Sequence, residues 1–386
     1  MTTTVVRASS SSSFLALVPR LLECTPHRSL VLVPFAHGRS LGALRVDLPH
    51  GRGQAELDSI ASTVIGTACK VARTDAIALA VYADETLNGG APLPHRDFVD
   101  AVLARADICG LRVVDALVVG ANAWNSYLDP SIPAGRPLAE IGSALTDAPD
   151  TLVAPDQFSA AELPDPDPAL ARAVARLLDD VDRVLARPRD RARLSAARQG
   201  AADDIVTTLA DPPALLEDAA RTRPDEVTPA RLAALAFCLE RPALRDVALM
   251  QWAGDITVGD AVFDAQTTFG DGEPFPVDLA RPMWGEGPAP DADRLRHALE
   301  LCRRVASVVP RERRPGALSA CAWLAWATGR SSHAGTYAQA AVEIDSAHGL
   351  SAIVLTMLDA GRLPEWIFER PTSPAGKESS RGSRGR

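Results

Sequence analysis

The sequence predicts an α/β domain at the N-terminus, with a mixed sheet covered by helices, followed by an all-α C-terminal region that ends in a tetratricopeptide-like helical hairpin. Three observations support this fold class. Short apolar runs typical of strands alternate with amphipathic segments only before residue 128. Eight prolines then fall between Asp129 and Pro168, where they disfavour central strands and long helices. From Ala169 onward the apolar residues follow the period of a helix.

Each element of the predicted sheet has its own signal. Ser29–Phe35 and Ser40–Leu48 are strand-like runs with a short gap, which predicts an antiparallel hairpin. Asp75–Tyr82 and Arg112–Val119 are almost continuously apolar, as in strands buried on both faces. A helix is expected before the first strand at 14–23, and further helices are expected between the strands at 55–72 and 96–106.

The domain organisation follows from these patterns and from two polar ends. We expect a disordered start at 1–13, the α/β domain at 14–128, a proline-rich crossing at 129–168, a helical region at 169–269, a Gly/Pro-rich linker at 270–290, C-terminal helical hairpins at 291–370 and a disordered tail at 371–386. The tail has almost no apolar side chain to bury, so folding could not offset its ordering entropy.

The last hairpin lies within Leu318–Ile344, where two helical patterns meet at Gly329-Arg330. Small residues on one face of the second helix are typical of a tetratricopeptide-type unit. No second repeat of about 34 residues, the length of a tetratricopeptide unit, occurs in the sequence. A single unit cannot bury its own apolar face. Packing against neighbouring helices is therefore favoured over a peptide-binding groove.

Charge limits the partners. The net charge is −9 and the pI is near 5.4, which disfavours general nucleic-acid binding because phosphate contacts need a basic surface. One basic run keeps that alternative open, and it contains Arg187, Arg189, Arg191 and Arg193. No apolar stretch is long enough for a membrane span or a signal-peptide core, so a membrane partner is not expected.

The cysteines predict a reducing compartment. They are Cys24, Cys69, Cys109, Cys238, Cys302 and Cys321. They are widely spaced, no C-x-x-C pair occurs, and most lie in apolar stretches. This pattern is typical of small buried hydrophobic residues rather than a disulfide framework, and it favours a cytoplasmic protein.

Three motifs resemble known sites but lack a required part. Gly38–Gly42 matches G-x-S-x-G around Ser40, yet a strand pattern follows where a nucleophile elbow needs a helix, so a hairpin turn is expected. Gly51–Gly53 lacks the third glycine of a dinucleotide fingerprint, because Glu56 stands there. Cys24, His27 and His37 offer three zinc ligands, but structural zinc takes four. No catalytic residue, metal or cofactor is predicted.

One candidate ligand site remains, at the carboxyl edge of the sheet. Ligands of open α/β sheets bind outside the strand C-termini. Asp84 and Glu85 follow one predicted strand, and a polar and aromatic group follows the next. That group comprises Asn122, Trp124, Asn125 and Tyr127. We expect a polar or cationic ligand there, and not phosphate, because no cation joins the set. The alternative is that the aromatic rings pack a domain junction.

Several segments together resemble the family called domain of unknown function 4192. They are Leu15–Pro19, Ser29–Val31, Arg45–Pro49, Trp124–Tyr127, Gly135–Leu138 and Ala322–Leu363. The resemblance spans roughly Phe14 to Glu369 and implies the fold and cytoplasmic residence, but no chemistry. The chain departs from the family pattern at Glu23-Cys24 and at Leu128–Ser131, where many members have Gly-Phe and cysteines.

Three functional classes stay open. The favoured one is a non-catalytic binding or regulatory module for a small polar ligand or a protein partner. An enzyme with an unrecognised site at the carboxyl edge of the sheet is the first alternative, and a nucleic-acid-associated protein is the second. A cleft with charged groups of perturbed pKa would favour the enzyme.

Overall fold

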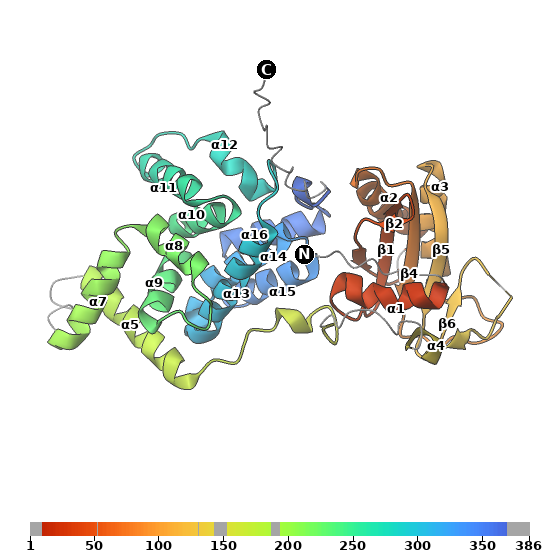
Figure 1. Cartoon of the computed structure of the whole chain (residues 1–386), viewed down its shortest axis with the longest axis horizontal. Coiled ribbons are helices and arrows are strands. Elements are labelled where there is room, and N and C mark those ends of the chain that lie inside the picture. Colours follow the sequence, from red (N-terminus) through yellow and green to blue (C-terminus); the bar gives the residue numbers. More distant parts are fainter. Residues whose placement is uncertain (1–9, 52, 130, 143–152, 187–193, 369–386) are drawn as a thin grey trace, which may run out of the picture.

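The computed structural model describes residues 10–51, 53–129, 131–142, 153–186 and 194–368. An α/β region and a helical region lie side by side in it (Figure 1). The segment before α5 (Pro168–Ala186) runs from one region to the other. The predicted fold class, a mixed sheet with helices followed by a helix-rich region, is confirmed.

The sheet has the order β2-β1-β4-β5-β6-β7, with β3 also pairing β1. Its strands are β1 (Ser29–Ala36), β2 (Arg39–Ser40), β3 (Leu44–Asp47), β4 (Ala76–Tyr82), β5 (Arg112–Val119), β6 (Ala123–Ser126) and β7 (Arg136–Pro137). Strand β1 is antiparallel to β2, β3 and β4, whereas β4 and β5 are parallel. The predicted hairpin is therefore present, and the two buried strands are parallel neighbours.

Helices cover both faces of this sheet. On one face α2 (Gln54–Lys70) and α3 (Arg96–Ile108) pack on the apolar side chains of β1, β4 and β5. On the other face lie α1 (Ser11–Leu22) and the short α4 (Ala139–Gly142) (Figure 1). Every residue of β4 is buried, as a strand with helices on both sides requires.

Helix α1 begins earlier than predicted. Residues 10–13 fall in the predicted disordered start, yet they form the cap and first turn of α1. The reason is a capping box: the Ser10 hydroxyl accepts from the Ser13 backbone N–H, and the Ser13 hydroxyl accepts from the Ser10 N–H. Residues 1–9 lie outside the described chain.

The proline-rich crossing contains only short elements in its described part. They are β7, α4 and the 3₁₀ turn η1 (Ser159–Ala161). A single bridge pairs Cys24 with Ala154, and so ties the crossing to the chain before β1.

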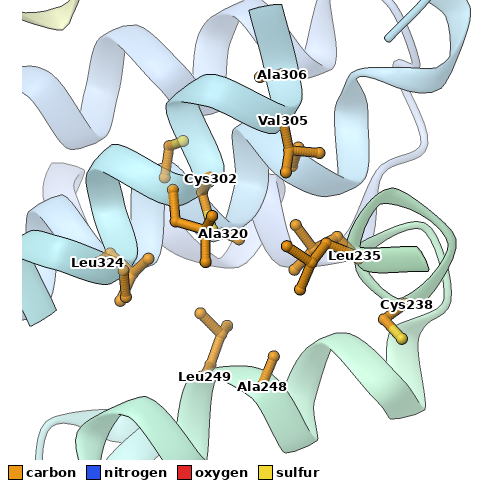
Figure 2. Close-up of a cluster of buried hydrophobic side chains, with 14 of the residues drawn as sticks. Leu235, Cys238, Ala248, Leu249, Cys302, Val305, Ala306, Ala320 and Leu324 are labelled. Carbon is orange, nitrogen blue, oxygen red and sulfur yellow. The ribbon is translucent and has the colours of Figure 1, made fainter. Parts of the chain in front are cut away.

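The helical region has a continuous core. Its longer helices are α5, α7 (Ala196–Thr208), α8 (Pro212–Arg221), α9 (Pro229–Leu239), α10 (Pro242–Ala253), α11 (Ile256–Gly270), α13 (Ala292–Val308), α14 (Pro315–Ala327), α15 (Ser331–Val342) and α16 (Gly349–Asp359). Figure 2 shows side chains from α9, α10, α13 and α14 converging, among them Leu235, Leu249 and Leu324. All thirteen residues of α14 are buried, so this helix is the centre of the region.

Short elements complete this region. Within 270–290 lie α12 (Val277–Ala280) and the 3₁₀ turn η2 (Arg281–Trp284), whose Leu279 and Met283 pack against the helical core. The 3₁₀ turns η3 (Arg311–Arg313) and η4 (Glu365–Phe368) precede α14 and follow α16. Helices α14 and α15 pack together as the predicted hairpin, whereas its tetratricopeptide-like character stays a prediction.

Polar contacts join the two regions. Arg45 of β3 donates to the Ser332 hydroxyl at the start of α15, with Nε at 3.1 Å. Arg330 pairs with Glu23 after α1, with Nη2 at 2.5 Å from Oε2. Both contacts lie where α15 approaches the β1–β3 side of the sheet.

Candidate functional site

A pocket of about 280 Å³ opens at one end of the sheet. Its lining is Arg28, Leu48, His50, Ala83, Asp84, Glu85 and His95. These residues come from four places: the start of β1, the chain after β3, the chain after β4 and the N-cap of α3. The register explains the convergence, because Ser29 opens β1 opposite both Asp47 of β3 and Tyr82 of β4.

The segment before β1 is held firmly. The buried Gln157 side chain from the crossing accepts from the His27 N–H and donates to the His27 carbonyl, each at 2.9 Å. The Arg28 carbonyl accepts from the Leu48 N–H at 3.0 Å. These bonds fix the backbone that presents the imidazole of His27 and the guanidinium of Arg28 to the pocket mouth.

Asp84 is the first of the two pocket carboxylates. His27 Nε2 lies 2.9 Å from its Oδ1, and Arg28 Nε lies 3.8 Å from its Oδ2. Arg28 also reaches His50, with Nη2 at 2.9 Å from Nε2. The side chains of His27, Arg28 and Asp84 are each more than half exposed, so a ligand can reach all three.

Glu85 and His95 form the second pair, with Oε1 at 3.7 Å from Nε2. The His95 side chain is only 17% exposed, and it is the most enclosed group of the two imidazole–carboxylate pairs. Burial lowers the pKa of His95 and outweighs Glu85, which raises it, while His50 and Arg28 lower it further. The imidazole is therefore neutral at pH 7 and can accept a hydrogen bond or a proton.

Backbone conformation singles out the same pocket. In the described chain, five non-glycine residues have a positive φ: Glu23, Arg28, His37, Arg73 and His95. Arg28 (φ 47°) and His95 (φ 54°) both line the pocket. A left-handed backbone costs a residue with a side chain about 1–2 kcal/mol. Such positions cluster at ligand-binding sites, where the structure around them holds the strain.

Of the sequence-predicted site residues, Asp84 and Glu85 lie in the pocket and Asn122 lies beside it. The Asn122 amide accepts from the Leu87 N–H at 2.8 Å and donates to the Leu87 carbonyl. The backbone of Glu85 is also held, since its carbonyl accepts a hydrogen bond from the Ala121 N–H at 3.0 Å. Asn122 thus positions the loop that carries Glu85.

The other three predicted residues lie elsewhere, because they belong to strand β6 and its end. Successive side chains of a strand point to opposite faces. Trp124 is buried on the α1 face, whereas Tyr127 is buried on the α2–α3 face with its hydroxyl donating to the Pro94 carbonyl. Asn125 is buried and donates to the Ile132 carbonyl at 2.9 Å. These contacts stabilise the sheet edge, so the structure does not bring the three side chains to the pocket.

The sequence reasoning missed three basic side chains of the pocket. Arg28, His50 and His95 stand beside the two carboxylates, although the expected site held no basic group. Their one local signal is weak: each flanks a strand or caps a helix. Only the register of β1 with β3 and β4 shows that they meet.

The motifs set aside from the sequence take ordinary places. Ser40 is exposed in β2, paired opposite Phe35 in the predicted hairpin. His37 stands at the hairpin turn, with its Nδ1 at 3.8 Å from Oδ2 of Asp75. Cys24 is buried. The described residues contain no group of three or more side chains that could hold a metal ion. The basic run 187–193 lies outside the described residues.

Two of the cysteines differ from expectation. Cys24, Cys238, Cys302 and Cys321 are buried as predicted, but Cys69 and Cys109 are exposed. Both sit at helix C-termini, where an apolar helical pattern ends and the chain turns towards solvent.

Fold and pocket together define a class of protein: an α/β domain with an open, charged pocket at the carboxyl ends of two strands, carried on a helical scaffold. The chain belongs to the family Domain of unknown function (DUF4192), whose model matches residues 12–258. The match contains the whole pocket and ends at the start of α11, so α13–α16 lie beyond it.

No curated protein and no solved structure matches this chain significantly. Within the described residues, no helix is both long enough and apolar enough to cross a membrane.

Proposed function

We propose that this protein is a non-catalytic binding or regulatory module that takes a small polar ligand in the pocket beside β4. The proposal rests on one observation: a single pocket is lined by two carboxylates, one guanidinium and two imidazoles. These belong to Asp84, Glu85, Arg28, His50 and His95. Two of those residues hold a left-handed backbone there. Cytoplasmic residence remains part of this proposal.

The lining indicates the ligand class. Two carboxylates suit an amino or other cationic group, while Arg28 and His50 suit a carboxylate or phosphate group. Leu48 and Ala83 give the lining an apolar part. The pocket volume of about 280 Å³ lies just below the roughly 300–1,000 Å³ of ordinary ligand pockets. We therefore infer a small ligand that carries a basic and an acidic group, such as an amino acid.

The decisive experiment measures binding to the full chain by native mass spectrometry and thermal shift. The probes are amino acids, spermidine as a cation and inorganic phosphate as an anion. An amino acid should raise the melting temperature more than either single-charge probe does. No binding of any probe, and no small molecule carried through purification, would contradict the proposal.

A matched pair of variants tests whether the pocket is responsible. Arg28→Gly and Arg73→Gly both relieve a positive φ at an exposed residue, but only Arg28 lines the pocket. Each should stabilise the fold by up to about 1 kcal/mol. Only Arg28→Gly should weaken binding, by tenfold or more. Equal binding by both variants would place the ligand elsewhere.

One observation favours an enzyme as the second candidate. Two imidazole–carboxylate pairs, His27–Asp84 and His95–Glu85, flank one pocket, and a positioned imidazole is the commonest general acid or base. Recovery of the bound ligand after long incubation separates the candidates. An unchanged mass supports a binding module, whereas a product that disappears with His95→Asn supports an enzyme.

A further inference from the structure

A second feature lies at the far end of α3, the helix whose N-cap residue His95 lines the pocket. Cys69 stands in the last turn of α2, and Cys109 is the C-cap of α3. Helices α2 and α3 pack against each other on one face of the sheet. Because these helices lead into the parallel, paired strands β4 and β5, their C-terminal ends lie at the same end of the sheet. Both cysteines are exposed, and the Cys109 thiol is close enough to raise the pKa of Cys69.

We propose that Cys69 and Cys109 form a site of reversible oxidation, closing to an intramolecular disulfide when the protein meets a hydroperoxide. Nothing in the proposed ligand-binding function requires this step. Helix α3 is 13 residues long, which places Cys109 about 20 Å from the His95 end that lines the pocket.

The chemistry balances in two steps. One thiolate attacks the peroxide, so that an S–O bond forms, the O–O bond breaks and water leaves after protonation. The second thiolate then attacks the sulfenic sulfur, the S–S bond forms, and the S–O bond breaks with loss of a second water. The two sulfur atoms together lose two electrons, and hydrogen peroxide is reduced to two molecules of water.

The rate of the first step depends on the thiolate fraction. Partial burial, followed by the neighbouring Cys109 thiol, raises the pKa of the Cys69 thiol above its ordinary value of 9.0. Proximity of the partner, rather than an activated thiolate, therefore favours closure at this site. We expect the disulfide to form faster as pH rises towards 9.

The chain supplies its own control in Cys302 and Cys321. Cys302 of α13 and Cys321 of α14 also neighbour each other, but both residues are fully buried. Burial and the neighbouring Cys302 thiol raise the pKa of Cys321 strongly. The two pairs share proximity and differ in access to solvent, so the peroxide should oxidise only the exposed pair.

The test treats the full chain with hydrogen peroxide, blocks remaining thiols with N-ethylmaleimide under denaturing conditions and maps peptides without reductant. A crosslinked peptide joining residues 69 and 109 is expected, lighter by two hydrogen atoms than its parts. Dithiothreitol should release it. Neither Cys69→Ser nor Cys109→Ser should form it, and Cys302 and Cys321 should stay alkylated.

Three outcomes would overturn the proposal. The first is that Cys69 and Cys109 stay fully alkylated after peroxide treatment. The second is that either advances to a sulfinic acid without any crosslink. The third is that the buried pair oxidises as fast as the exposed pair, because oxidation would then report unfolding. The melting transition of the oxidised chain is measured as well. If it is retained, the chain has stayed folded and oxidation of the exposed pair is not a consequence of unfolding.

Discussion

The carboxylates that distinguish the two regions of the molecule differ in burial: Glu217 of the helical region is enclosed, whereas Asp84 and Glu85 of the α/β region are exposed. In the helical region the carboxylate of Glu217 is enclosed, and it contacts Arg294 at 2.6 Å and Arg221 at 3.0 Å. The Gln251 side chain adds a hydrogen bond at 3.3 Å. These contacts, led by Arg294, lower the pKa of Glu217. Its charge is satisfied within the protein and needs no ligand.

In the α/β region the side chains of Asp84 and Glu85 are each 56% exposed, and both residues line an open pocket. Exposed pairs contribute little to stability, about 0–1 kcal/mol. The strain at Arg28 and His95 costs more than that. These carboxylates add little to stability and stay accessible to the ligand that we propose for the pocket. The difference between the regions thus separates a structural ion pair from a candidate site.

The largest expected effect breaks the helical pair. Arg294→Met leaves the buried Glu217 carboxylate without its main partner and should destabilise the fold by about 3 kcal/mol. Urea denaturation measures this loss. The double variant Glu217→Gln, Arg294→Met should recover most of it, because no unpaired charge remains. A double variant as unstable as Arg294→Met would show that packing, not charge, is responsible.

A second change acts on the pocket through the backbone. A Cβ added at Gly120 would lie 2.6 Å from the Glu85 carbonyl oxygen and 3.0 Å from Leu87. Gly120→Ala should therefore displace the loop carrying Glu85, cost about 1–3 kcal/mol and weaken ligand binding. Gly66→Ala is the matched control, since its Cβ meets nothing within 4 Å in an exposed helical turn. That control should stabilise slightly.

A third prediction concerns the junction of the two regions in acid. Burial, then Arg330, Arg303 and Arg45, lowers the pKa of His333 from 6.5 to about 4, while Glu23 opposes them. Between these values the unfolded chain binds the proton and the folded chain does not, so stability falls as pH drops from 6.5 towards 4. His333→Gln should flatten this part of the stability–pH curve. An unchanged slope would mean that other groups dominate it.

The smallest expected effect on stability sharpens the comparison most. Asp84→Asn with Glu85→Gln should change the free energy of unfolding by less than about 1 kcal/mol. The same double variant should abolish binding of a basic group. Circular dichroism melts and the binding assay give both numbers. A large loss of stability would make this pocket a structural junction like the one around Glu217.

Local patterns were sufficient for much of the fold. The strand β5 has the predicted bounds, and β4 matches its predicted bounds within one residue, because continuous apolar runs are local signals. Helix α11 was not predicted individually. Its Gly259 weakens the helical pattern, and only the structure shows why glycine stands there: a Cβ would overlap the Gln251 side chain of α10.

The sequence by itself determined the family, the fold class and the place of Asp84 and Glu85 at the end of a buried strand. Only the tertiary structure decided which groups join them. The antiparallel register of β1 brings Arg28 to that edge, and the N-cap of α3 brings His95. Trp124 lies in the short strand β6 and Tyr127 directly follows it, and the two side chains are buried on opposite faces of the sheet. Pairing register depends on residues that lie far apart in the chain, so composition and spacing do not reveal it. Strand β6 has only four residues, which is too few for its alternation to be recognised from the sequence.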